Sequence, residues 1–203
     1  GDRINELTLV VMETALVDGK QAIALDPRFK LAVNMSAKSL SDTHLLFDIM
    51  TLLGRFAFPP ENLTLELTET AAMGDPITSL DILTRLRMKG FKVSIDDFGT
   101  GYSSMLQLVR LPFSELKVDK TFVMTANTVP ESKLVIKAII ELAQSLGLQV
   151  TAEGIEDYET LLFLQSLGCD LAQGYFIAKP MPGETVIEWL TKQHQPKYAK
   201  DDV

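Results

Sequence analysis

The chain has 203 residues, of which 46% are hydrophobic and 23% charged, and its formal net charge at pH 7 is −8. This length suits one globular domain, and the negative charge argues against a general nucleic-acid surface, which would be basic. No apolar run approaches the roughly 18 residues that a membrane span requires. No basic-then-apolar leader precedes residue 20 either, so we expect a cytoplasmic chain without a membrane segment.

Helices and strands are predicted to alternate along the chain. Helical periodicity is present at residues 4–16, 45–56, 77–90, 131–147, 158–168 and 183–193. Short strand-like runs lie between them, at residues 31–35, 63–67, 91–96, 115–119, 148–153 and 171–176. This alternation predicts an α/β domain over residues 1–193, with a parallel sheet covered by helices, and a tail over residues 194–203. Phe163, Leu164 and Trp189 lie at helical spacing, and we expect them to pack helices against the sheet.

Polar side chains stand at or near the carboxyl end of each predicted strand. They are Asn34, Glu66, Asp96 with Asp97, Lys117 with Asp119, Glu153 and Gln173. Polar strand ends that converge on one axis are typical of the carboxyl-terminal face of a barrel, whereas a doubly wound open sheet gathers ligands at a single crevice. No G-x-G-x-x-G follows the first strand, which weakens a dinucleotide-binding interpretation. We therefore expect a barrel.

Each of these residues has a structural explanation when it is taken alone, because a carboxylate or amide after a strand often caps the next turn or helix. As a set they point to a cation. Strand alternation places Glu66 on the face opposite Leu65 and Leu67, and it places Lys117 and Asp119 on one shared face. Inward carboxylates without counter-charge would repel one another, so either their pKa values rise or a divalent cation lies among them. Oxygen ligands without a His or Cys cluster favour Mg²⁺, Mn²⁺ or Ca²⁺ over zinc.

Six segments of the chain can be compared with a known pattern: VNMSAKSL (33–40), LTLELTET (63–70), SIDDFGTGYSS (94–104), LKVDKTFV (116–123), TAEGIED (151–157) and LGCDLAQGYFIAKP (167–180). In order and spacing they resemble the successive blocks of the EAL domain family, the cyclic di-GMP phosphodiesterases of bacteria. The resemblance covers nearly the whole chain. It implies a modified (β/α)8 TIM-type barrel that opens cyclic di-GMP to linear pGpG with two Mg²⁺ or Mn²⁺ ions.

The resemblance also implies roles for individual residues. Asn34, Glu66 and Asp96 match ligands of one metal ion, and Asp96 is expected to bridge to a second ion that Asp97 and Glu153 help to hold. The catalytic residues implied in this way are Glu153, Asp97, Lys117, which contacts the attacking water and the phosphate, and Gln173, which supports the water network. The residues expected to support the substrate or the loop after the aspartate pair are Glu69, Phe98, Gly99, Thr100, Gly101, Asp119 and Glu156. For Glu156 a carboxylate that favours a helix start is an equally good explanation.

One feature of the family is missing. The family is named for a Glu-Ala-Leu stretch on its second strand, and this triplet occurs nowhere in the 203 residues, nor does the strand that precedes it. The six predicted strands fit a barrel that lacks its first two. Three explanations are open: the sequence is a fragment, a partner chain completes the barrel, or the protein is a degenerate relative. We favour a fragment, because every remaining ligand is intact.

Two functions therefore stay open. The first is a metal-dependent phosphodiesterase, in which the resemblance also implies a homodimer and a fused or associated sensory or receiver domain. The second is a catalytically inactive module that binds cyclic di-GMP or a protein partner. A kinase-like use of the Asp-Phe-Gly triplet is excluded, because neither an H-R-D loop nor a glycine-rich loop is present.

Overall fold

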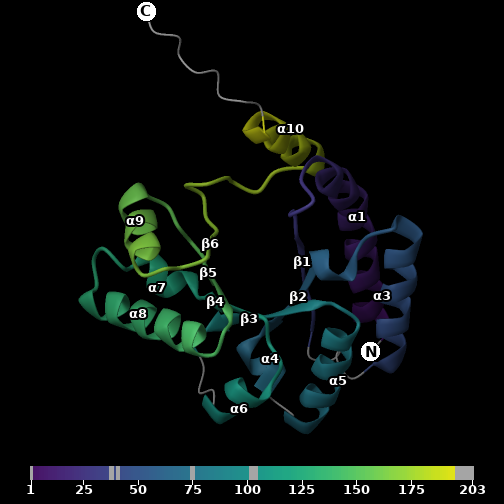
Figure 1. Cartoon of the computed structure of the whole chain (residues 1–203), viewed down its shortest axis with the longest axis horizontal. Helices are drawn as coiled ribbons and strands as arrows, with labels where there is room; N and C mark the ends of the chain where they lie inside the picture. Colours follow the sequence, from purple (N-terminus) through teal and green to yellow (C-terminus); the bar gives the residue numbers. More distant parts are fainter. Residues whose placement is uncertain (1, 37–38, 40–41, 74–75, 101–104, 195–203) are drawn as a thin grey trace, which may run out of the picture.

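A curled parallel sheet is the centre of the molecule. The structure, a computed structural model, describes residues 2–36, 39, 42–73, 76–100 and 105–194. In this part of the chain, six strands pair in sequence order and are all parallel. They are β1 (Leu31–Asn34), β2 (Leu63–Thr68), β3 (Lys92–Phe98), β4 (Glu115–Val118), β5 (Gln149–Ala152) and β6 (Leu171–Ala172). Figure 1 shows the sheet bent into an open half-barrel, as expected for the barrel class.

Helices lie around the outside of this sheet (Figure 1). They are α1 (Asp2–Leu25), α3 (Thr43–Phe56), the 3-10 helix η1 (Pro60–Asn62), α4 (Glu69–Met73), α5 (Pro76–Met88), α6 (Met105–Arg110), α7 (Lys120–Met124), α8 (Pro130–Ser145), α9 (Tyr158–Ser166) and α10 (Gly183–His194). Among the described residues, no helix combines the length and the apolar character that crossing a membrane requires. The short helices α4 and α7 follow strands and were not part of the predicted pattern.

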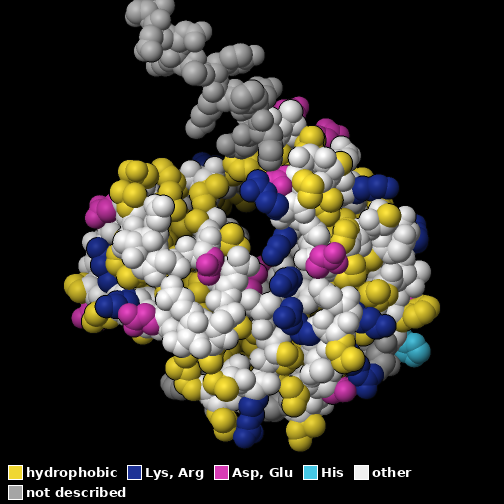
Figure 2. Space-filling view, in the orientation of Figure 1, with side chains coloured by type: hydrophobic (Ala, Val, Ile, Leu, Met, Phe, Trp, Pro, Cys, Tyr) yellow, Lys and Arg dark blue, Asp and Glu magenta, His cyan; other side chains and the backbone are white. Residues whose placement is uncertain are grey.

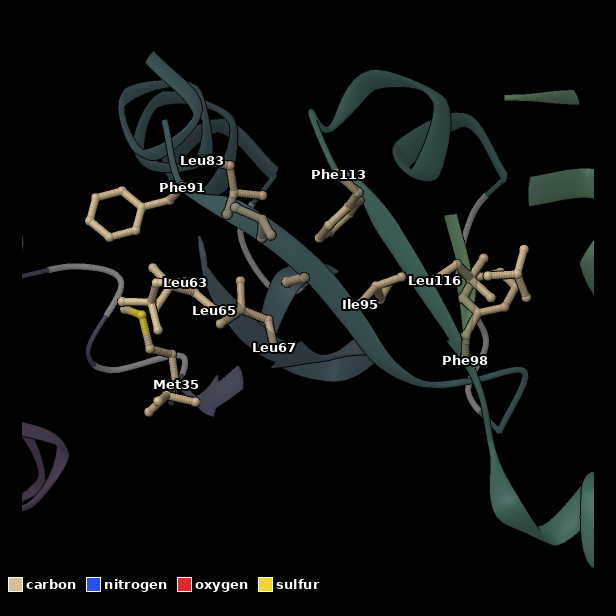
Figure 3. Packing of buried hydrophobic residues seen from close by; sticks show 14 of the residues in the cluster. Met35, Leu63, Leu65, Leu67, Leu83, Phe91, Ile95, Phe98, Phe113 and Leu116 are labelled. Carbon is tan, nitrogen blue, oxygen red and sulfur yellow. The ribbon is translucent and has the colours of Figure 1, made fainter. Parts of the chain in front are cut away.

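The two faces of the strands have different chemistry, and this difference positions the site. Leu63, Leu65 and Leu67 of β2 are fully buried. Figure 3 shows them in the core layer between the sheet and the helices, with Phe91 and Leu83 close by. Since alternate residues point to opposite faces, the Thr64 and Glu66 side chains of the same strand point into the concave side of the sheet. Burial of the apolar face, worth about 1.5–3 kcal/mol per large side chain, therefore fixes which polar residues face inward.

Most elements differ from their predicted bounds by only a few residues, but α1 and β6 differ more. Helix α1 continues to Leu25, well past the predicted end at residue 16. Its second half contains Gly19, which lies against the Phe58 ring: a Cβ added there would be 3.0 Å from the ring atom Cε2. Close packing of this kind keeps a glycine inside a helix despite its low helix propensity. Helix α10 ends at His194, the first residue of the predicted tail, and the rest of the tail lies outside the described residues.

The last strand is shorter than predicted, since β6 ends at Ala172 and not at residue 176. After it the chain turns: the Ile177 and Ala178 amides donate to the Gly174 carbonyl at 3.0 and 3.1 Å. The Gly174 backbone passes so close to the Ile155 backbone that a Cβ would have no room. The glycine therefore marks a close backbone approach beside the site and not the middle of a strand.

Candidate active site

The Lys117 ammonium group lies among three carboxylates inside the curled sheet. Its Nζ atom is 2.6 Å from Oε1 of Glu153, 2.8 Å from Oε1 of Glu66 and 3.4 Å from Oδ1 of Asp96. Lys117 is on β4, Glu66 on β2 and Asp96 on β3, and Glu153 directly follows β5. Side chains from four neighbouring strands therefore converge on one point. The Lys117 side chain is only 4% exposed. The structure therefore brings together four of the residues that the sequence singled out.

The charges in this cluster shift the pKa values of its members. Burial raises the pKa values of Glu66 and Glu153, and the contacts with Lys117 offset only part of this effect. Burial by itself would lower the pKa of Lys117, but its bonds to Glu153 and Glu66 outweigh burial, and the pKa rises above the ordinary value. Lys117 therefore stays protonated at neutral pH. A single ammonium group cannot neutralise three carboxylates, so the cluster favours further positive charge.

Asp97 completes a group of oxygen ligands beside the ammonium. Carboxylate oxygens of Asp96, Asp97 and Glu153 lie within 4.8 Å of one another. Asp97 has a left-handed backbone with φ of 55°, a conformation that costs energy for a residue with a Cβ and that recurs at active sites. Burial raises the pKa of Asp97, and the neighbouring carboxylates of Asp96 and Asp119 raise it further. Clustered carboxylates with raised pKa values fit a hard divalent cation such as Mg²⁺, Mn²⁺ or Ca²⁺.

The loop after the aspartate pair is held by Glu69, the first residue of α4. Glu69 is 4% exposed, and its Oε2 atom accepts a hydrogen bond from the Gly99 amide at 3.1 Å. Gly99 has a φ of 102°, and a Cβ added there would be 3.1 Å from both Ile139 and Phe122. Glycine is therefore required at this position for both conformation and space.

The rest of the described loop supports the same arrangement. The Phe98 side chain is buried, and the Thr100 hydroxyl donates to the Asp97 carbonyl at 2.9 Å. This bond fixes the backbone that carries the Asp97 carboxylate. Gly101, also expected in this loop, lies outside the described residues.

Replacing Glu69 with alanine is expected to lower the free energy of unfolding by about 1–3 kcal/mol, because a buried hydrogen bond to a charged acceptor is lost. Amide hydrogen exchange at Gly99 should become faster. Glu69→Gln is the matched control, since its side-chain carbonyl can still accept from Gly99. Unchanged exchange at Gly99 in the alanine variant would show that Glu69 does not hold the loop.

The remaining predicted residues lie around the cluster. Asn34 ends β1 in register with Glu66 of β2. Asp119 is the N-cap of α7, where its Oδ1 atom accepts from the Thr121 amide at 2.8 Å. Gln173 follows β6; its backbone amide donates to Ala152 at 2.9 Å, and its backbone carbonyl accepts from Ile155 at 3.1 Å. Gln173 and Glu156 line, together with Glu153, a cavity of about 1240 Å³.

This cavity lies between β6, β1 and α10, where Figure 2 shows an opening in the middle of the molecule. Its wall includes Lys120, Tyr175, Lys179 and Trp189, which were not predicted as site residues. The expected packing of Trp189 against the sheet is wrong, because its side chain lines the cavity and is 36% exposed. Tyr175 could have been found from its place in the QGY stretch, and Lys120 from its place after Asp119. The sequence around Trp189 gives no comparable signal.

The chain matches the family model described as the EAL domain over residues 2–180. It is 37% identical to the cyclic di-GMP phosphodiesterase RocR of Pseudomonas aeruginosa, across 93% of this chain and 48% of that protein. It is also 36% identical to the cyclic di-GMP phosphodiesterase PA2567 of the same organism, across 90% of this chain and 31% of that protein. The chain thus spans about half or less of the length of these curated relatives.

Solved structures agree with this match. The structure titled PaMucR phosphodiesterase, c-di-GMP complex, superposes with a TM-score of 0.85 at 37% identity, across 89% of this chain and 74% of that one. The EAL domain of Mycobacterium smegmatis DcpA superposes with a TM-score of 0.86 at 34% identity, across 93% and 86% of the two chains. Motif order, family model and three-dimensional similarity all agree, and this chain belongs to the EAL domain family.

Proposed function

We propose that the protein containing this chain is a metal-dependent phosphodiesterase that hydrolyses cyclic di-GMP to linear pGpG. The observation that carries the proposal is the buried cluster in which Lys117 contacts Glu66, Asp96 and Glu153. A merely structural ion pair would balance its charges, whereas this cluster has an excess of carboxylate and lies beside a large cavity. The names of the relatives support the choice of substrate, because RocR is named a cyclic di-GMP phosphodiesterase.

The residues fit a site for two Mg²⁺ or Mn²⁺ ions. Asn34, Glu66 and Asp96 would hold one ion, and Asp96 with Asp97 and Glu153 would hold the second. When bound, such ions would neutralise the charge of a phosphodiester and lower the pKa of water, which then loses a proton more easily and is a better nucleophile toward phosphorus at neutral pH. The choice of Mg²⁺ or Mn²⁺ over Ca²⁺ rests on the family.

Two further side chains would act on the substrate directly. Lys117 points its ammonium group into the carboxylate cluster. An ammonium group carries three N–H donors, and here they face Glu66, Asp96 and Glu153. Cations that took over the carboxylate oxygens would release these donors for a phosphate oxygen and the attacking water. Gln173 lies beside Glu153 in the cavity wall, where its amide can orient water. The net reaction consumes one water and breaks one phosphoester bond of the ring.

The test is product analysis after incubation of cyclic di-GMP with Mn²⁺, and with EDTA in place of Mn²⁺. Both the 203-residue chain and the full gene product that contains it are assayed. Formation of pGpG that requires the metal supports the proposal. If both proteins bound cyclic di-GMP and neither hydrolysed it, the proposal would be overturned and the chain would be a receptor module.

Assembly and regulation are part of the same proposal. We expect the protein to act as a homodimer and to be controlled by a sensory or receiver domain. The excess length of the relatives supports additional domains, since this chain covers 48% of RocR. Sedimentation of the full gene product would measure its oligomeric state.

A further inference from the structure

A second layer of polar side chains lies on the same concave face of the sheet, two residues before the carboxylate cluster along the strands. Ser94 is two residues before Asp96 on β3, so both side chains point to the same side. Thr151 of β5 and Glu115 of β4 face the same side, because they precede Glu153 and Lys117 by two residues. Ser94 and Thr151 are 0% and 5% exposed. None of these three residues has a role in the reaction proposed above.

The Ser94 hydroxyl has no hydrogen-bond partner among the described residues, although it is completely buried. Buried polar groups are nearly always bonded, so an orphan hydroxyl calls for a physical explanation. Its neighbours supply one. In the strand register, Ser94 is paired with Glu66 on one side and with Glu115 on the other. Neighbouring strands are about 4.8 Å apart, so a hydroxyl donor stands between two carboxylate side chains.

The two neighbouring carboxylates differ in how they are bonded. Glu115 accepts a short hydrogen bond from the Thr151 hydroxyl, at 2.5 Å. Glu66 has Lys117 as its donor, at 2.8 Å. Lys117 also contacts Glu153, at 2.6 Å. A cation that entered the cluster would compete with the Lys117 ammonium for the Glu66 oxygens. Glu66 is therefore the carboxylate that gains most from a second donor.

We infer that Ser94 is a positioning residue for the metal site, and that its hydroxyl donates to the Glu66 carboxylate when a divalent cation is bound. Glu115 and Thr151, the other members of this layer, are hydrogen-bonded to each other. The inference rests on the proposed function, because it assigns Glu66 to a metal ion. Donors that orient a ligating carboxylate change metal affinity by about 10–100-fold when they are removed.

The test compares Mn²⁺ affinity, measured by isothermal titration calorimetry, in the 203-residue chain and in its Ser94→Ala variant. We expect the variant to bind Mn²⁺ about 10–100-fold more weakly. In EDTA its melting temperature should be equal to or higher than that of the parent chain, since removal of an unbonded buried hydroxyl relieves a cost and breaks no bond. Ser94→Thr retains the hydroxyl and should retain the affinity.

Ser132→Ala is the matched control. Ser132 is also buried, but it lies on helix α8 and not on the sheet, and its hydroxyl is bonded to the Thr125 hydroxyl at 2.8 Å. This variant should melt at a lower temperature and bind Mn²⁺ normally, which is the reverse of the result expected for Ser94→Ala.

Two results would overturn the inference. One is an unchanged Mn²⁺ affinity in Ser94→Ala. The other is a weaker affinity accompanied by a lower melting temperature in EDTA, which would mean that Ser94 supports the fold. If the parent chain itself bound no Mn²⁺ while the full gene product also failed to hydrolyse cyclic di-GMP, the proposed function would fail, and the role of Ser94 with it.

Discussion

Replacing Lys117 with methionine is expected to lower the free energy of unfolding of the metal-free chain by about 3–5 kcal/mol, the cost of removing one partner from a buried ion pair. The Lys117 ammonium is the shared counter-charge of Glu66, Asp96 and Glu153, and its side chain is 4% exposed. Methionine has nearly the same length but no charge, so the carboxylates would be left facing one another. Urea unfolding in EDTA measures the difference.

Divalent metal should reverse much of this loss, and that reversal identifies the site. A cation bound among the carboxylates supplies the charge that Lys117→Met removes, so Mn²⁺ should stabilise the variant more than the parent chain. Lys137→Met is the matched control. Lys137 is 56% exposed and lies 3.8 Å from Glu141, and breaking such a surface pair changes stability by less than about 1 kcal/mol. Equal unfolding free energies for Lys117→Met and the parent chain in EDTA would contradict the central role of Lys117.

The sequence predicted the scaffold of the site because its strands have a simple pattern. In β2, leucines at positions 63, 65 and 67 alternate with inward residues, so the direction of the Glu66 side chain follows from strand alternation alone. Alternation of strands and helices was enough to predict a parallel sheet with converging carboxyl ends. The observed fold is an open half-barrel that carries the predicted carboxylates on its concave side.

The bonding inside the cluster could not be predicted in the same way. The sequence indicated carboxylates that lack a counter-charge, whereas the structure places Lys117 in direct contact with Glu66, Asp96 and Glu153. That contact depends on the register of neighbouring strands, and between β3 and β4 the register shifts between Ile95 and Phe98. A bulge of this kind has no signature in residue spacing alone.

The orphan hydroxyl of Ser94 could not be predicted for a related reason. Ser94 lies in the SIDDFGTGYSS stretch, but a small serine two residues before an aspartate pair carries no signal of its own. Only the pairing of β3 with both neighbouring strands shows that Ser94 is in register with Glu66 on one side and with Glu115 on the other. Sequence spacing gives the face of a residue, and the register gives its neighbours.

Replacing Asp96 with asparagine is expected to reduce cyclic di-GMP hydrolysis by the full gene product, and Mn²⁺ binding, by more than about 100-fold. This exceeds the effect of removing an outer partner, because Asp96 itself is proposed to bind both ions. Its carboxylate lies within 4.8 Å of oxygens of both Asp97 and Glu153, so it is central to the ligand group. Asp81→Asn is the control, because Asp81 is 59% exposed and pairs with Arg85 on the outer helix α5.

The same substitution should not destabilise the metal-free chain. Burial is the main cause of the raised pKa values of Asp97, Glu66 and Glu153, and the charge of Asp96 raises them further, so removal of this charge lowers the repulsion within the cluster. The ion pair that is lost with it is the longest of the three that Lys117 makes, at 3.4 Å. A residue selected for stability would show the opposite result, since its loss would cost unfolding free energy and leave catalysis intact. Loss of activity with unchanged or higher stability is the signature of a carboxylate that is kept for its ligand. If Asp96→Asn instead lowered stability and left hydrolysis unchanged, the cluster would be a structural ion-pair network, and the metal would have to bind elsewhere.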